Sequence, residues 1–348
     1  MKVLILGNMG YVGPNLVNQL RATYPDGELI GFDIGYFAHC LTNAMYLPET
    51  KLDRQIFGDI REFPAEVLNG VDAVVDLAAI SNDPMGFKFE EITLDINCRQ
   101  AVRVAKLAKE KGVRSFVYAS SCSMYGLADD SPRKEGDKLN PLTAYARSKV
   151  MAEEQLEPLA DGGFTVTCLR YATACGWSSR LRLDLVLNDF VAGALVNHQI
   201  SILSDGTPWR PMINTKDMAR SIDWAITRDA SNGGKFLAVN TGSNDWNNRV
   251  STLAEAIASV IPGVDIVTNP NAPPDKRSYR ANFDLFKKLA PNHQPREDLI
   301  STVQEIKRNL IGMKFNDPNY RESLFIRLKV LDQLQGQGLL NANLQWAT

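Results

Sequence analysis

The start of the chain places three glycines between an apolar run and a helix-like pattern. Residues 2–6, KVLIL, form a continuous run of mostly branched apolar side chains, which is typical of a buried parallel strand. Gly7, Gly10 and Gly13 follow in GNMGYVG, and apolar residues at helical spacing come next. In such a unit the first glycine permits the tight turn, the second lets the backbone approach a pyrophosphate, and the third lets the helix pack close to the sheet. The pattern predicts a dinucleotide-binding unit, although its first gap is one residue longer than in G-x-G-x-x-G and such a turn can also lack a ligand.

Strand and helix patterns alternate over the first half of the chain. Because strands that alternate with helices form parallel sheets, this order predicts an α/β fold with a doubly wound parallel Rossmann sheet. The further strand patterns lie at 28–33, 73–79, 115–121, 164–171 and 235–240, and helical patterns at 97–112, 141–159, 184–199 and 215–226.

The pattern changes after Tyr171, and a smaller mixed α/β lobe is expected to follow. The sequence tail YRESLFIRLKVLDQLQGQGLL is amphipathic and is expected to dock on the body or to mediate oligomer contact. We predict a dinucleotide-binding domain over 1–172 with a return segment at 211–245, and a substrate-binding lobe with a C-terminal helical tail over 173–210 and 246–348.

Asp33 ends the second predicted strand, about 20 residues past the last glycine of the loop. A carboxylate at this place accepts hydrogen bonds from the adenosine ribose hydroxyls and repels a 2′-phosphate. No Arg or Lys follows closely in DIGYFAH, so NAD is favoured over NADP. Asp33 is also compatible with an ordinary strand-end turn, and Asp59 in GDIR with either an adenine contact or a turn.

Composition restricts the classes of partner. The formal net charge is −2, so there is no overall basic field, and neither nucleic acid nor an anionic membrane surface is expected as a partner. The five cysteines are scattered, and with only three histidines they form no metal-binding pattern, so no metal is expected and a reduced, cytoplasmic location is favoured. Neither a signal peptide nor an apolar run of about 18 residues is recognised, so no membrane span is expected.

Residues 145–149 read YARSK within a helical pattern, so Tyr145 and Lys149 lie on the same helix face. A free tyrosine has a pKa near 10. A nearby ammonium and the positive nicotinamide ring are both expected to lower that pKa toward a value suited to proton transfer with a substrate hydroxyl. Ser121 ends a strand pattern in YASSCSMYG, so its hydroxyl is expected in the same crevice. Alone, Tyr-x-x-x-Lys is more often a solvated helix face, but its place after a glycine loop, an acidic strand end and a serine-rich strand end favours chemistry.

With these residues in this order, the chain resembles the extended short-chain dehydrogenase/reductase family, in its NAD-dependent nucleotide-sugar epimerase/dehydratase group. The resemblance covers nearly the whole chain through GNMGYVG, GDIR, DLAA, SSCSMYG, YARSK, LRYATACG, LRLDLVLNDF and DGTPWRPMINTKDMA. It implies that Tyr145 is the base, that Lys149 is its partner and that Ser121 orients the substrate hydroxyl. It further implies cofactor contacts at Tyr11, Val12, Asp59, Ile60, Leu77, Ala78 and Ala79, and a structural or water-relay role for Asn97.

The same resemblance implies a nucleotide-sugar substrate. Asn188 and Arg210, and more weakly Arg277, match positions that hold the diphosphate, for which an arginine fork is well suited. Arg210 and Arg277 remain compatible with ordinary surface arginines.

Other candidates for the substrate lie after predicted strands. Ser81, Asn82 and Asp83 follow the 73–79 strand pattern and either contact sugar hydroxyls or form an Asx-type turn ahead of Pro84. Ser123 and Thr173 are further substrate-binding candidates.

A homodimer through 97–111 and 142–159 is the family-level expectation. The sequence supports it only through apolar residues such as Val102 and Leu156, which also suit a core.

In this group the base takes a proton from a sugar hydroxyl, usually at C4, while hydride passes to NAD, and the second step defines the enzyme. Cys122 and Ser123 stand where dehydratases carry an acid pair, so a 4,6-dehydratase is disfavoured. The leading hypothesis is a nucleotide-sugar 4-epimerase. SSRLRLDLVLNDF, PPDKRSY and Thr173, where many epimerases have Asn, keep open a GDP-heptose-type 4-dehydrogenase or ketoreductase with tightly bound NAD(H). A non-catalytic NAD-binding protein and a reductase of small carbonyl compounds are further alternatives.

Overall fold

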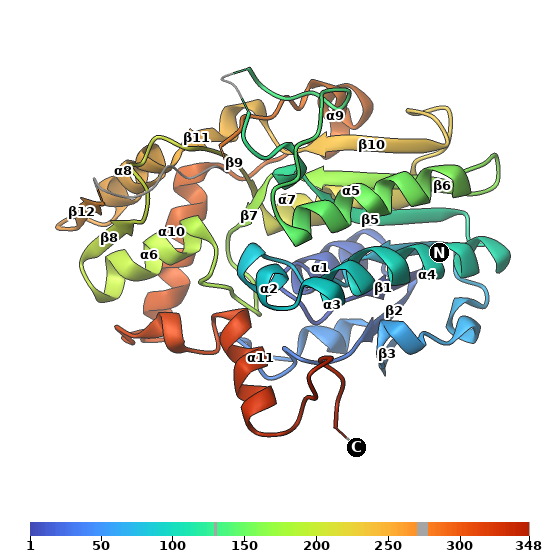
Figure 1. The fold of residues 1–348 in the computed structure, drawn as a ribbon, viewed down its shortest axis with the longest axis horizontal. Helices are drawn as coiled ribbons and strands as arrows, with labels where there is room; N and C mark the ends of the chain where they lie inside the picture. Colours follow the sequence, from blue (N-terminus) through green and yellow to red (C-terminus); the bar gives the residue numbers. More distant parts are fainter. Residues whose placement is uncertain (129–130, 270–277, 348) are drawn as a thin grey trace.

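The computed structural model describes residues 1–128, 131–269 and 278–347. Its largest element is a seven-stranded sheet in the order β10-β6-β5-β4-β1-β2-β3, in which every neighbouring pair is parallel. Helices cover both faces (Figure 1), which confirms the predicted doubly wound Rossmann fold. The strands are β1 (Lys2–Leu6), β2 (Glu28–Asp33), β3 (Arg54–Phe57), β4 (Ala73–Asp76), β5 (Ser115–Ser121), β6 (Thr165–Tyr171) and β10 (Phe236–Thr241).

Side chains of β1 alternate between two hydrophobic clusters. Leu4 and Leu6 pack with helices α4 and α5, whereas Val3 and Ile5 pack with α1 and α7. Successive side chains of a strand point to opposite faces, so a strand covered on both faces is apolar at nearly every position. This is why KVLIL is a continuous apolar run. The helices are α1 (Gly13–Thr23), α4 (Ala101–Glu110), α5 (Ala144–Leu156) and α7 (Thr215–Thr227).

One strand of the large sheet was missed, and one predicted strand ends three residues early. The edge strand β3, RQIF, was missed because its side chains are only partly buried and show no apolar run. The strand predicted at 73–79 ends at Asp76, because the chain turns beneath the glycine loop at Leu77. Residues 77–79 line the cavity described below.

Helices α6, α8 and α10 and strands β8 and β12 gather at one end of the large sheet (Figure 1). A third hydrophobic cluster joins α6, α8 and α10, and helix α9 lies beside β10. The domain boundaries stay a prediction. The elements are β7 (Thr173–Cys175), β9 (Trp209–Asn214) and β11 (Asn247–Arg249) in one sheet, β8 (Gln199–Ile202) paired with β12 (Asp265–Thr268), and helices α6 (Val186–Val196), α8 (Val250–Val260), α9 (Asp284–Leu289) and α10 (Leu299–Gly312).

The C-terminal tail docks on the body, one of the two outcomes expected for it. Helix α11 (Arg327–Gly336) buries Val330 and Leu331 completely, and both belong to the hydrophobic cluster that also contains side chains of β1 and β2. Val102 and Leu156, considered for a dimer interface, are buried in this same cluster. They are core residues and do not support a dimer.

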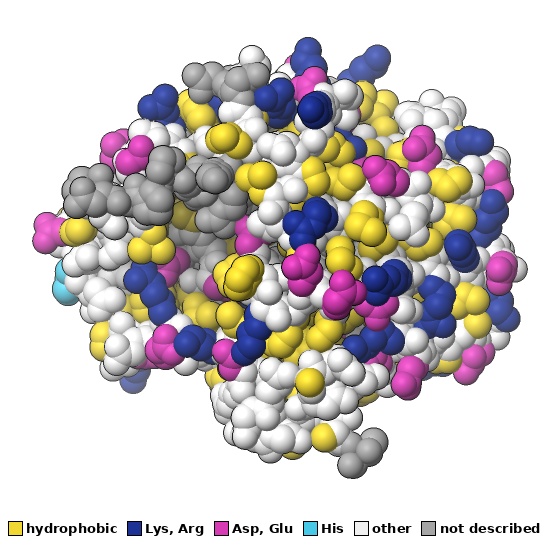
Figure 2. Space-filling model, viewed as in Figure 1, with side chains coloured by type: hydrophobic (Ala, Val, Ile, Leu, Met, Phe, Trp, Pro, Cys, Tyr) yellow, Lys and Arg dark blue, Asp and Glu magenta, His cyan; other side chains and the backbone are white. Residues whose placement is uncertain are grey.

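The surface carries both signs of charge. Lys and Arg side chains are interspersed with Asp and Glu over the face in Figure 2. Over residues 1–128, 131–269 and 278–347, no helix is both long enough and apolar enough to cross a bilayer.

The third glycine of the loop permits close packing of α1. A Cβ at Gly13 would lie 1.8 Å from the backbone oxygen of Asn8, a fully buried residue. We expect Gly13→Ala to lower the free energy of unfolding by about 1–3 kcal/mol, because the backbone must shift to remove this overlap. Thermal unfolding measures the effect. Gly312→Ala is the matched control, since nothing lies within 4 Å of a Cβ there, and equal stability of the two variants would contradict the prediction.

Candidate active site

A cavity of about 1010 Å³ opens along the carboxyl ends of the strands of the large sheet. It is lined by residues that follow β1 to β6, by the β7–α6 segment and by the start of α11. The strand order reverses between β1 and β4. In open parallel sheets, ligands bind in the crevice at this reversal, so the cavity lies where the fold is expected to hold a ligand.

The glycine loop forms one wall of the cavity. Gly7 has φ of 76°, and a Cβ there would lie 2.6 Å from the backbone nitrogen of Ala78. Only glycine fits this close approach without a shift. The predicted cofactor contacts Gly7, Gly10, Tyr11, Val12, Leu77, Ala78 and Ala79 all line the cavity, whereas Gly13 serves helix packing.

Asp33 lies at the end of β2 and lines the same cavity. Its carboxylate accepts hydrogen bonds from the backbone nitrogens of Met9, at 2.9 Å, and Gly35, at 2.7 Å. Burial raises the pKa of Asp33, and these two hydrogen bonds act in the opposite direction. The carboxylate is therefore held beside the glycine loop, as a ribose acceptor requires.

Asp59 and Ile60 line the cavity at the same end. The Asp59 carboxylate accepts from the backbone nitrogen of Arg61 at 2.9 Å and pairs with its guanidinium at 2.6 Å. Asp59 is thus a turn residue that also forms part of the cavity wall, and its contact with adenine stays a prediction.

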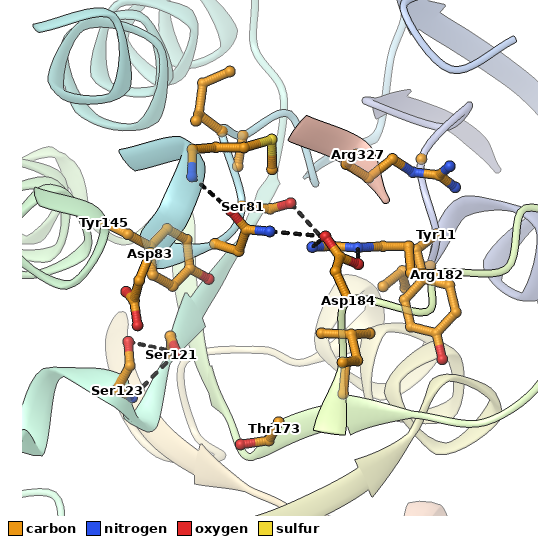
Figure 3. A pocket seen from close by; sticks show the side chains of 18 of the residues that line it. Tyr11, Ser81, Asp83, Ser121, Ser123, Tyr145, Thr173, Arg182, Asp184 and Arg327 are labelled. Carbon is orange, nitrogen blue, oxygen red and sulfur yellow. Dashed lines mark hydrogen bonds and ion pairs between the residues drawn. The ribbon is translucent and has the colours of Figure 1, made fainter. Parts of the chain in front are cut away.

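Tyr145 and Lys149 of α5 line the cavity together with Ser121, which ends β5. Figure 3 shows Tyr145 and Ser121 on the same side of the cavity. Thr143 caps the helix by accepting from the Ala146 backbone nitrogen at 3.1 Å, which positions Tyr145 in the first turn. The Lys149 Nζ lies 5.7 Å from the centroid of the Tyr145 ring. The Ser121 hydroxyl donates to that of Ser123 at 2.9 Å.

The expected lowering of the Tyr145 pKa is not found in the protein alone. Burial raises this pKa to about 12, and the Ser121 hydroxyl and the Arg182 charge oppose the rise. Burial also lowers the pKa of Lys149 to about 8. For Tyr145, desolvation of the phenolate therefore outweighs the hydrogen bond from Ser121 and the charge of Arg182.

Asp76, which sequence analysis did not select, lies next to this group. Its Oδ1 accepts from the Ala78 backbone nitrogen at 3.0 Å, while the buried Oδ2 finds no hydrogen-bond partner among the described residues. Burial raises the pKa of Asp76 to about 7, and the charge of Lys149 opposes this. The nearby carboxylate in turn favours the charged form of Lys149. The sequence feature that could have identified Asp76 is its place as an acidic residue at the end of the apolar run AVVD.

Most of the predicted substrate residues reach the cavity. Asn82 caps α2 (Asp83–Lys88) by accepting from the Met85 backbone nitrogen at 2.9 Å, so the Asx-type turn is present. Arg277 lies outside the described residues. The residues that line the cavity are Ser81, Asn82, Asp83, Ser123, Thr173 and Arg210.

The side chains of Asn188 and Asn97 form hydrogen bonds with other groups of the protein. Asn188 is fully buried, accepts from the Gly176 backbone nitrogen at 3.1 Å and donates to the Tyr11 hydroxyl at 2.9 Å and the Arg182 carbonyl at 2.8 Å. Its amide is committed to the protein and does not line the cavity. Asn97 accepts from the Ile80 nitrogen and donates to the Ile80 oxygen, which supports its structural role.

A buried ion pair in the cavity wall was also missed. Arg182 binds the Asp184 carboxylate through two nitrogens at 2.8 and 3.0 Å and donates to the Ser81 hydroxyl at 2.9 Å. Asn82 donates to Asp184 at 2.8 Å. Figure 3 shows this pair between Ser81 and Tyr11. Through Ser81 and Asn82, the ion pair joins the β4–α2 loop to the segment before α6. The charges in RLRLD do not predict this contact between the two segments.

The sequence matches the model of the NAD dependent epimerase/dehydratase family over residues 3–242. The chain belongs to this family.

Several members and neighbours of this family resemble the chain. A UDP-glucose 4-epimerase of Lactobacillus helveticus is 29% identical over 185 residues, which cover 51% of this chain and 53% of the relative, so the match spans about half of that relative's length. The solved structure of MoeE5 in complex with UDP-glucuronic acid and NAD has a TM-score of 0.76 at 24% identity and covers 90% of this chain and 99% of its own. TunA, an NAD dependent-NDP-hexosamine 5,6-dehydratase, has a TM-score of 0.77 at 21% identity, with 91% and 99% covered. Both structures support the same fold.

As a member of this family of enzymes, the chain uses NAD. The cavity residues fit this cofactor. Gly7 makes the close backbone approach that a pyrophosphate site requires, and Asp33 presents a carboxylate one strand away. Tyr36, Phe37 and Ile60 supply apolar walls beside Asp33 and Asp59.

Asp33→Asn is expected to weaken NAD binding about tenfold or more, because it replaces charge-assisted hydrogen bonds worth about 1.5–3 kcal/mol. It is also expected to narrow the preference for NAD over NADP, since the repulsion of a 2′-phosphate is removed. Calorimetric titration with both nucleotides measures the two effects. Asp26→Asn, in an exposed turn, is the control, and an unchanged NAD affinity of Asp33→Asn would contradict the assignment.

Proposed function

We propose that the chain is an NAD-dependent nucleotide-sugar 4-epimerase with Tyr145 as the base. The observation that carries the proposal is the convergence of Ser121, Tyr145 and Lys149 in one cavity with the glycine loop and Asp33. A solvated helix face would leave Tyr145 and Lys149 outside, but Lys149 is 2% exposed and both residues line the cavity.

The Tyr145 phenolate takes the proton of the sugar hydroxyl as that carbon becomes a carbonyl. When bound, NAD supplies the acceptor for the hydride that leaves the same carbon and later returns it. Ser121 holds the reacting oxygen, and Lys149 stabilises the phenolate. After the keto-sugar has turned, its opposite face meets the returning hydride, which inverts the centre, and Tyr145 returns its proton to the oxygen. The Tyr145 pKa of about 12 in the protein alone means that the positive charge of bound NAD is needed to favour the phenolate.

A nucleotide sugar suits the rest of the cavity. Arg210 offers a cationic fork for a diphosphate, and Ser81, Ser123 and Thr173 offer hydroxyls for a sugar. UDP-glucose is the natural first candidate, because a 4-epimerase relative acts on it. Asn188 is not part of the proposal, since its amide already binds protein groups.

We also infer a homodimer, from the family resemblance, and a cytoplasmic location, from the scattered cysteines, all five of which are free. Met151, which is 39% exposed on α5, is available for an interface of this kind. Analytical ultracentrifugation distinguishes a dimer from a monomer.

A dehydrogenase or ketoreductase differs from the epimerase only in its second step. Purified protein without added cofactor is mixed with a panel of nucleotide sugars, absorbance is followed at about 340 nm, where reduced nicotinamide absorbs, and products are analysed by NMR. An epimerase gives an inverted centre with a transient signal or none. A lasting signal with a keto-sugar identifies a dehydrogenase and overturns the proposal. Silence across the panel with NAD bound favours a non-sugar substrate or a binding role.

Tyr145→Phe is expected to lower the turnover rate about 10²–10⁴-fold, because it removes the proton-transfer group. NAD content should stay unchanged. Tyr46→Phe, at an exposed position, is the control. Retention of wild-type turnover by Tyr145→Phe would exclude Tyr145 as the base.

Arg210→Gln is expected to raise the substrate dissociation constant about tenfold or more by removing a charged contact to diphosphate, with little effect on NAD. Calorimetry of the NAD-loaded protein measures it. Arg249→Gln is a close control, because Arg249 is the next cation on the paired strand β11 and does not line the cavity. Equal substrate affinity of Arg210→Gln and wild type would remove the support for a nucleotide sugar.

A further inference from the structure

The C-terminal segment, residues 339–347, forms a loop at the lower edge of the molecule, near β3 (Figure 1). It follows α11, which is held at its start and near its middle. At its start, Arg327 donates to the Arg180 carbonyl at 2.8 Å and its guanidinium lies 4.8 Å from the Phe37 ring. Farther along, Asp332 pairs with Lys88 of α2 at 2.6 Å. The C-terminal segment therefore leaves a helix that is already docked.

The C-terminal segment has an internal structure of its own. The Asn341 nitrogen donates to the Gln345 oxygen at 2.9 Å, and the Ala347 nitrogen donates to the Leu339 oxygen at 2.9 Å. Leu340 is 4% exposed and Leu344 is fully buried, in the cluster that contains Ile30, Phe32 and Ile60. From Gln333 onward the sequence carries no charged residue. This folded, uncharged turn is suited to packing against an apolar wall.

Its contacts concentrate on residues next to the predicted adenosine end of the cavity. The Tyr36 hydroxyl and Arg61 Nη2 both donate to the Leu344 carbonyl, and Arg61 Nη1 donates to the Asn343 carbonyl at 2.6 Å. The Trp346 indole donates to the Ile34 carbonyl at 2.8 Å, and its ring lies 5.9 Å from that of Tyr36. Ile34 directly follows Asp33 in the chain.

Each of these partners belongs to the cofactor wall or holds a residue that does. Tyr36 and Ile34 line the cavity themselves. Arg61 binds the Asp59 carboxylate, which also lines it. One short segment thus braces the loop after β2 and the turn after β3 from behind, over the part of the cavity where the ribose and adenine of NAD would lie.

We propose that the C-terminal segment is a positioning element of the NAD site, which holds Tyr36 and the Asp59–Arg61 pair against the adenosine half and retains NAD between turnovers. A retained cofactor serves the proposed epimerase, because the hydride must return to the same sugar from the same NAD. The retention itself does not depend on which sugar reaction follows.

The experiment measures the release of NAD from the holoenzyme in the absence of sugar. Trp346→Ala removes the bond to Ile34 and the ring contact, Tyr36→Phe removes the hydroxyl bond, and Leu344→Asp places an unpaired charge in an apolar site. Asn343→Ala is the matched control, since its exposed side chain makes none of these contacts and its backbone carbonyl is retained. Bound NAD per chain after gel filtration, the NAD release rate and the unfolding midpoint are recorded for each protein.

We expect Trp346→Ala and Leu344→Asp to release NAD about tenfold faster or more, and Tyr36→Phe a few-fold faster, in line with lost hydrogen bonds and packing. Asn343→Ala should match wild type. Saturating free NAD should restore the turnover rate of Trp346→Ala, which a general loss of structure would not allow. Release rates within about twofold of wild type in Trp346→Ala and Tyr36→Phe, which are the variants least disruptive to folding, would overturn the proposal. Because no sugar is present, this result is separate from the outcome of the epimerase assay.

Discussion

Parallel pairing of β1 with β2 on one side and β4 on the other is the constraint on which the rest of the site depends. Leu6 at the end of β1 is in register with Phe32 of β2 and Asp76 of β4. The three strands therefore end at one edge, and the turns that follow them must share the space above it. The turns after β1 and β4 can lie this close together because Gly7 has no Cβ that would clash with the backbone of Ala78. The same edge then receives Ser121 from β5 and, through α5, Tyr145 and Lys149.

Buried charge is the second feature that organises the site. Arg180 with Glu49, Arg182 with Asp184, and Lys149 beside Asp76 all lie within or next to the cavity wall. Removing a charge from water is costly, and a partner only partly offsets the cost. Such pairs stabilise little by themselves, but they join loops that are distant in the chain. The pair Arg182–Asp184 holds the β4–α2 loop, and Arg180–Glu49 holds the segment that precedes β3.

Burial also connects the chemistry to the cofactor. In the protein alone, desolvation raises the pKa of the Tyr145 phenol, so the group is protonated at neutral pH. In the proposed reaction, the positive charge that NAD carries on its oxidised ring would favour the phenolate. A site of this kind gains from an NAD that stays in place, and the C-terminal segment lies against the residues that would hold its adenosine half.

The sequence by itself determined the features that depend on local periodicity and local turn chemistry. The apolar runs placed the strands β1, β2, β5, β6 and β10, and GNMGYVG, Asp33 and YARSK located the nucleotide loop, its acid and the Tyr–Lys pair. These strands and motifs can be recognised in the sequence because strand alternation, helix period and glycine geometry act over a few residues. The edge strand β3 was missed because partial burial erases the apolar signal.

Only the tertiary structure decided which polar groups meet. Asn188 is an example. The family resemblance assigned it to the diphosphate, but in the structure its side-chain amide forms hydrogen bonds with Tyr11, Gly176 and Arg182. The hydrogen bonds of Arg182 to Ser81 and of Asn82 to Asp184, the nearness of Asp76 to Lys149 and the docking of Leu344 behind Tyr36 likewise join segments separated by tens to hundreds of residues. Hydrogen bonds and desolvation are set by distances in space, and a single sequence contains no local signal of them.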